Sequence, residues 1–203
     1  QRLRYVIEMR SKMRFFHISD LHFGKLLYGY DLTEEHRNFI EQLGDYCDKY
    51  NPDAVLIAGD VYDRSVPSAD AMTLLDELLN KLSGRKVFII SGNHDNAKRL
   101  SFGKDFLKKH DIYISTVPQT GENEKIEKVT YADEYGNVNI YMLPFLKPAL
   151  FKNSMPEEAA AGEDAIIKKL VENTDIDKNE RNIILAHQFF VSGHKEPELC
   201  ESE

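Results

Sequence analysis

Apolar residues in the first half of the chain alternate between short continuous runs and longer stretches with helical spacing. The segments Arg14 to Ser19, Ala54 to Ala58 and Val87 to Ile90 are short and mostly apolar, which predicts buried strands. Between the first two, Thr33 to Tyr50 has helical spacing and stops at Asn51-Pro52. A repeat of strand, loop and helix is typical of a parallel sheet with right-handed crossovers.

Two helices are expected to cover this sheet. One apolar face of the segment 33–50 is made of Phe39, Ile40, Leu43, Tyr46, Cys47 and Tyr50. Ser68 is a suitable N-cap for a second helix that ends at Gly84. Its inward residues are expected to be Met72, Leu75, Leu78, Leu79 and Leu82.

The pattern changes in the second half of the chain. A short helix is expected over Ala97 to Lys109, and then Ile126 to Tyr131 and Val138 to Leu143 flank a turn sequence that is typical of a hairpin. Pro156 to Glu172 has helical spacing, and Asn182 to Ala186 is a further strand. A second, more antiparallel sheet is therefore predicted to pack on the first, which makes the fold α/β.

Composition narrows the class of protein. A chain of 203 residues with 42% hydrophobic content is enough for one core, which we assign to residues 13–203, while residues 1–12 are an extension, natural or artificially added. The formal charge of −8 predicts weak binding of nucleic acid by the chain alone. Only two cysteines and no long apolar run favour a cytoplasmic protein away from membranes.

Residues that bind divalent metals follow the predicted strands in a fixed order: Asp20 and His22 in HISDLHFG, Asp60 in GDVYDR, Asn93 and His94 in GNHD, and His187 in ILAHQ. Parallel strands bring their carboxyl ends to one edge, so these side chains should meet there. Oxygen and imidazole donors suit manganese, iron, zinc or magnesium. Asp60 is the best bridging carboxylate, because Gly59 leaves room for close approach.

These motifs, in this order, resemble those of the calcineurin-like metallophosphoesterases, and the flanking sequence resembles the SbcD-type nuclease subunits within that superfamily. The resemblance implies a four-layer αββα fold of two mixed β-sheets between helices. It also implies two divalent ions, with manganese favoured. Asp20, His22 and Asp60 would bind the first ion, and Asp60, Asn93 and His187 the second.

The same resemblance assigns roles to residues beside the metals. His94 is expected to contact the substrate phosphate and protonate the leaving oxygen without binding metal. The Asp63 side chain would hydrogen-bond and orient His94, and Arg64 would bind a phosphate oxygen. His17, inside a strand, is expected in the core or behind the ligands, and His36, on a polar helix face, at the surface.

The implied function is that of a manganese-dependent DNA exonuclease and endonuclease subunit, acting in DNA end processing and double-strand-break repair. Its expected partners are DNA, an SMC-like ATPase subunit and a second copy in a homodimer. This sequence lacks the family's later His-x-His motif and capping domain, so residues 13–203 are expected to be a C-terminally truncated domain with weak activity alone. The alternatives are a phosphatase or small-molecule phosphodiesterase, and a noncatalytic scaffold.

Overall fold

A parallel four-stranded sheet lies at the centre of the computed structural model, which describes residues 13–118 and 124–190. The strands are β1 (Phe15–Ile18), β4 (Ala54–Ala58), β5 (Lys86–Ile90) and β6 (Ile112–Ser115), in the order β1-β4-β5-β6. Strand β6 was not predicted. The inner strands β4 and β5 are buried along almost their whole length, because layers cover both faces of the sheet.

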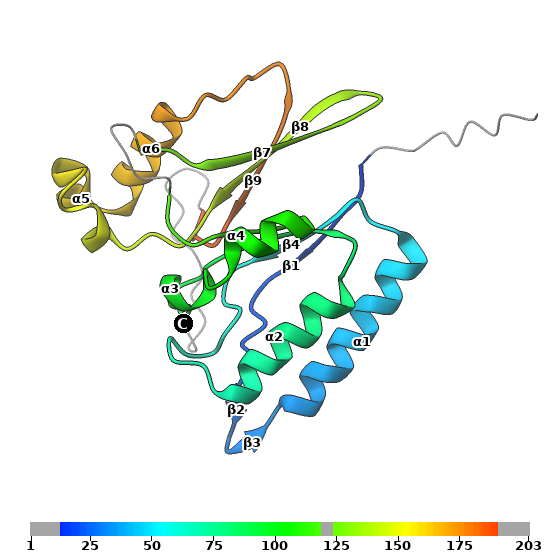
Figure 1. The fold of residues 1–203 in the computed structure, drawn as a ribbon. Coiled ribbons are helices and arrows are strands. Elements are labelled where there is room, and N and C mark those ends of the chain that lie inside the picture. Colours follow the sequence, from blue (N-terminus) through cyan, green and yellow to red (C-terminus); the bar gives the residue numbers. More distant parts are fainter. Residues whose placement is uncertain (1–12, 119–123, 191–203) are drawn as a thin grey trace, which may run out of the picture.

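Helices α1 (Thr33–Tyr50) and α2 (Ala69–Lys81) lie side by side on one face of this sheet (Figure 1). Helix α1 has the predicted bounds. The predicted cap of α2 is confirmed, since the Ser68 hydroxyl accepts a hydrogen bond of 3.1 Å from the Ala71 N–H. A continuous apolar core fills the space between the helices and the sheet.

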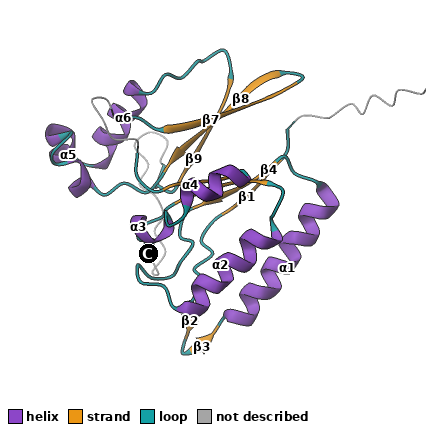
Figure 2. Ribbon diagram, viewed as in Figure 1, coloured by secondary structure: helices purple, strands orange, loops and turns teal. Residues whose placement is uncertain are grey.

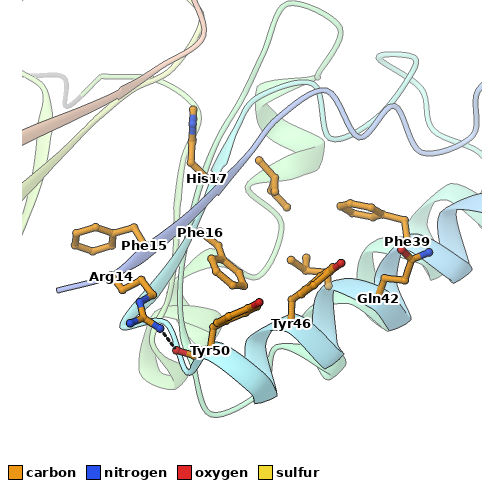
Figure 3. Close-up of a pocket in the computed structure, with 10 residues that line it drawn as sticks. Arg14, Phe15, Phe16, His17, Phe39, Gln42, Tyr46 and Tyr50 are labelled. Atoms are coloured by element: carbon orange, nitrogen blue, oxygen red, sulfur yellow. Dashed lines mark hydrogen bonds between the residues drawn. The ribbon is translucent and has the colours of Figure 1, made fainter. Parts of the chain in front are cut away.

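Some side chains that were predicted to face inward do not. Met72 is 55% exposed, Tyr46 51% and Tyr50 41%. The two tyrosines line an open pocket of about 710 Å³ between α1 and β1, as Figure 3 shows. Strand β1 has no neighbour on its outer side among the described residues, so this part of the helix has little sheet to pack on. His17, expected to be enclosed, is exposed at the same edge.

The segment predicted as one helix over residues 97–109 is three short ones. They are α3 (Ala97–Leu100), α4 (Lys104–Leu107) and the 3-10 helix η1 (Lys108–His110). Gly103 has φ 73° and interrupts the helix between α3 and α4. A small hairpin of β2 (Leu26–Leu27) and β3 (Tyr30–Asp31) was also not predicted.

The second sheet contains β7 (Glu127–Asp133), β8 (Gly136–Leu143) and β9 (Arg181–Ala186). The predicted hairpin is confirmed, because β7 and β8 pair antiparallel; β8 and β9 pair parallel, so the sheet is mixed. Apolar side chains between the two sheets form a second core. They are Ala54, Leu56, Ala58, Phe88, Ile90, Ile140, Met142 and Leu185.

Helices α5 (Pro156–Ala161) and α6 (Glu163–Asn173) replace the single helix predicted from Pro156, because Gly162, at φ 111°, separates them. Together with η2 (Pro148–Phe151) they belong to a third core, on the outer face of the second sheet. Figures 1 and 2 show the resulting layers, which confirm the αββα architecture. None of the described helices is long and apolar enough to cross a membrane.

Candidate metal centre

The loops after β1 and β4 run side by side beyond the ends of their strands. The Asp20 N–H donates to the Gly59 carbonyl at 3.1 Å, and the His22 N–H donates to the Asp60 carbonyl at 3.0 Å. A parallel bridge between Phe23 and Tyr62 continues the pairing. The first two motifs are therefore held in register by backbone hydrogen bonds.

Left-handed backbone turns direct these side chains out of the strand direction. Asp20, His22 and Asp60 have φ values of 57°, 45° and 49°. This conformation is uncommon for residues other than glycine, although aspartate and histidine adopt it more readily than most. The surrounding hydrogen bonds maintain it, which is typical of functional sites.

Asp60 is at the centre of the group. Its side chain is buried, and one carboxylate oxygen, Oδ1, accepts a hydrogen bond of 2.9 Å from the His94 N–H. The other, Oδ2, lies 3.7 Å from His22 Nε2, 3.9 Å from His94 Nε2 and 3.6 Å from His187 Nε2. Three imidazoles from three separate segments therefore face a single carboxylate oxygen.

The other ring nitrogen of each histidine faces a protein oxygen. Nδ1 of His187 lies 2.6 Å from the Ala58 carbonyl, and Nδ1 of His94 lies 2.8 Å from the Asp63 carbonyl. Nδ1 of His22 is 3.5 Å from the Asp63 carboxylate. Because a carbonyl oxygen only accepts, these contacts place a proton on Nδ1 of His187 and of His94, and metal-binding histidines commonly donate their other ring N–H to a protein oxygen in this way.

Two glycines make the close approach possible. A Cβ on Gly59 would lie 2.5 Å from His187 Nδ1, and a Cβ on Gly92 would lie 2.1 Å from the Asp60 Oδ1. Gly59 also has φ 86°. The expectation that Gly59 provides room beside Asp60 is confirmed, and Gly92 has the same role from the facing loop.

Asp95 organises the site, although the sequence analysis did not select it. Its buried carboxylate accepts hydrogen bonds from the N–H groups of Val61, Tyr62 and Gly92, at 3.1, 2.9 and 2.9 Å. It therefore ties the loop after β4 to the loop after β5. The signal was its position as the last residue of GNHD, directly after two candidate site residues.

The charges in the site reinforce one another. Burial raises the pKa of the Asp60 carboxyl, but contact with His187 and the His94 N–H lowers it, and the balance leaves this pKa below its usual range. Contact with Asp60 raises the pKa of His187, with a smaller contribution from the Ala58 carbonyl, against the opposing effect of burial. Asp60 is therefore an anion at neutral pH and attracts cations.

These residues fit divalent metal ions. The separations of 3.6–3.9 Å are too long for hydrogen bonds but near the spacing of donors that share an ion with bonds of about 2.0–2.2 Å. Two groups could each hold an ion: His22, Asp60 and His94, and Asp20, Asp60 and His187. Asn93 Oδ1 lies 3.1 Å from His187 Nε2, beside the second group. Both groups share Asp60, although their division differs from the expected sets.

Asp63 and Arg64 differ from expectation in their contacts. His94 is oriented by the backbone carbonyl of Asp63, whereas the Asp63 carboxylate lies against His22. Arg64 is largely exposed and lies 3.6 Å from the Asp63 carboxylate. His36 is partly enclosed, because its ring packs edge-on against Phe23 with centroids 5.2 Å apart.

A four-layer sandwich with histidine and carboxylate donors gathered at its strand ends is the architecture of a metal-dependent phosphoesterase. Comparison with protein families agrees, since the model described as "Calcineurin-like phosphoesterase" matches residues 13–201. The chain belongs to this family, whose members are hydrolases that use divalent metals.

A curated relative is the SbcD subunit of the nuclease SbcCD from Staphylococcus epidermidis (strain ATCC 12228 / FDA PCI 1200), which is 30% identical over 180 residues. The match covers 86% of this chain but 46% of the relative. The chain therefore spans less than half the length of that relative.

Proposed function

We propose that the chain carries the catalytic centre of a DNA nuclease that hydrolyses phosphodiesters with two divalent ions, preferably manganese. The observation that carries the proposal is the convergence of His22, His94 and His187 on one oxygen of Asp60. The similarity to a nuclease subunit supports DNA as the substrate. End processing and double-strand-break repair would be the setting.

Each residue then has a definite task. Asp60 would be shared by the two ions, Asp20 and His22 would hold one, and Asn93 and His187 would hold the other. When bound, such a pair of ions would activate a water and neutralise charge on the phosphate. The His94 imidazole, held by the Asp63 carbonyl, contacts a phosphate oxygen and gives its proton to the leaving oxygen. Arg64, on the exposed side, binds a phosphate oxygen.

The proposed partners follow from charge and from the relative. With a net charge of −8, the chain has weak electrostatic attraction to DNA, so additional contacts must hold the substrate. The relative's name describes it as a subunit of the nuclease SbcCD. We propose an SMC-like ATPase as another subunit, bound outside the region described here.

An exposed apolar face suits the proposed homodimer. Phe102 is 85% exposed and Phe106 65%, and with Met72 they line a pocket of about 630 Å³ between α2 and the segment α3–α4. Asp76 lies on the α2 side, and Lys98 and Arg99 lie on the other. A two-fold axis that runs between the acidic and the basic side would bring each acidic side against the basic side of the second copy.

The test compares three substrates in manganese: linear DNA, bis-p-nitrophenyl phosphate and p-nitrophenyl phosphate. We expect weak cleavage of DNA and of the diester by this chain alone, and much less of the monoester. Calorimetric titration with manganese should show two ions per chain. Preference for the monoester or for a cyclic nucleotide would instead indicate a phosphatase or small-molecule phosphodiesterase. Absence of metal binding would leave a noncatalytic scaffold.

A further inference from the structure

We propose that Phe145 and Lys147 form a substrate-positioning surface beside His187, in which the phenylalanine ring stacks on a nucleobase and the lysine binds a neighbouring phosphate. This inference rests on the proposed nuclease function and extends it to the way the DNA strand is held. None of the motifs in the sequence analysis includes either residue.

The segment after β8 is fixed against the metal centre. The Phe145 N–H donates a hydrogen bond of 2.8 Å to the carbonyl of Ser91, which directly precedes the Gly92-Asn93-His94 loop. The Phe145 ring lies 6.5 Å from the His187 ring, centroid to centroid, at an interplanar angle of 75°. Phe145 therefore lies next to His187 and is hydrogen-bonded to the residue before the loop that contains Asn93 and His94.

Burial alternates along the segment that contains Phe145 and Lys147. Leu146 is 1% exposed and belongs to the third core, whereas Phe145 is half-buried and Lys147 is exposed. Lys147 has an extended backbone, with φ −111° and ψ 111°. In extended chain, alternate side chains point the same way, so we place the Lys147 side chain on the side of Phe145 as part of the proposal.

Core packing does not account for Phe145. Its neighbours Leu143 and Leu146 are core residues, but Phe145 is in none of the three apolar cores of the described residues. A partly exposed aromatic ring beside metal ligands is suited to stacking on a base, and an exposed lysine two residues further along is suited to the adjoining phosphate.

Binding is measured by fluorescence anisotropy with a single-stranded oligonucleotide in manganese, on a His94→Ala background that slows cleavage. Phe145→Ala should weaken binding by about 5- to 150-fold, the range found for loss of one base stack. Lys147→Gln should reduce the slope of log affinity against log salt by about 0.7. The matched controls are Tyr135→Ala and Lys152→Gln, which should bind normally. Tyr135 is exposed in the β7–β8 turn, and Lys152 is exposed in the segment after β8, beyond Lys147.

A photocrosslink tests stacking directly. An oligonucleotide that contains 5-iodouracil should crosslink to Phe145, as located by mass spectrometry, and not to Tyr135. Crosslinking elsewhere together with normal binding by Phe145→Ala would overturn the proposal.

Hydrolysis of bis-p-nitrophenyl phosphate distinguishes two roles of Phe145, which are stacking on a base and holding the His187 ring in place. With native His94, Phe145→Leu should keep the kcat for this diester, which has no base, while the KM for DNA rises. An equal loss on both substrates would show that Phe145 only supports His187. If the unmodified chain binds no manganese, the proposed function itself is wrong, whereas two bound manganese ions together with normal oligonucleotide binding by Phe145→Ala would overturn this inference alone.

Discussion

The two sheets contribute to the metal centre in different ways. The parallel sheet supplies the loops after β1, β4 and β5, whose backbones are hydrogen-bonded to one another and tied together by Asp95. The mixed sheet supplies His187 and, beside it, Phe145. The first contribution is organised by neighbouring loops, whereas the second depends on how one sheet packs on the other.

The difference shows where the site is sensitive. The apolar layer between the sheets sets the position of β9, and the bond from His187 Nδ1 to the Ala58 carbonyl then aligns the ring. Local changes in the parallel sheet should therefore disturb both ions, while changes at the junction of the sheets should disturb mainly the ion bound by His187.

The largest effect is expected at Asp60, where the two contributions meet. Asp60→Ala should remove both ions and lower cleavage by more than about 100-fold, since loss of outer hydrogen-bonding partners alone costs about 10- to 100-fold. His187→Ala is the matched comparison and should weaken mainly one ion. Anomalous scattering at the manganese edge measures the occupancy of each site in both variants. Two fully occupied sites in Asp60→Ala would contradict the bridging role.

A second test separates ligand from proton donor within the parallel sheet. His94→Ala should lower cleavage by about 100-fold or more while both manganese ions stay bound. The reason is that the proposed role of His94 is proton transfer, although its Nε2 also lies within reach of an ion shared with His22 and Asp60. Metal content measured by mass spectrometry decides between the two roles, because loss of an ion would show that His94 is a metal ligand.

The junction of the sheets is tested by Gly59→Ala. Its new Cβ would lie 2.5 Å from His187 Nδ1 and 2.9 Å from the Gly92 Cα, so affinity for the ion at His187 should fall by about 10- to 100-fold. Gly84→Ala is the control, since Gly84 has a similar φ of 80° but nothing within 4 Å of the added atom. Both variants should lose about 1 kcal/mol or more of stability from backbone strain. Equal manganese affinity in the two variants would contradict the crowding argument.

The smallest effect is expected in the pH dependence of stability, at His36. Burial lowers the pKa of His36 below its ordinary value, against a smaller opposing effect of the Leu21 carbonyl. Below about pH 6.5 the unfolded chain takes up a proton that the folded state resists, so stability should fall as the pH drops from there towards the folded pKa.

His36→Phe should keep the packing on Phe23 and remove this part of the acid sensitivity. Thermal unfolding of both proteins at pH 8 and pH 5.5 measures it. The same drop in melting temperature in both would show that His36 titrates freely.

Local sequence determined much of the parallel sheet. Strand β4 and helix α1 have their predicted bounds, because an apolar run and a helical repeat with a clear stop are signals carried by adjacent residues. The candidate ligands were also selected from the sequence, since the residues that end parallel strands meet at one edge. The role of Gly59 was also predicted from the sequence, because a glycine next to Asp60 leaves room for close approach.

Tertiary structure decided the rest. Tyr46 and Tyr50 continue the apolar face of α1, but they are exposed because β1 is the last strand of its sheet in the described part of the chain. The partner of His94 is a carbonyl and not a side chain, and backbone groups have no sequence signature. His187 meets Ala58 across 129 residues, and Phe145 meets Ser91 only after two sheets have packed. Such contacts arise from the burial of apolar surface between sheets, which no local pattern of residues specifies.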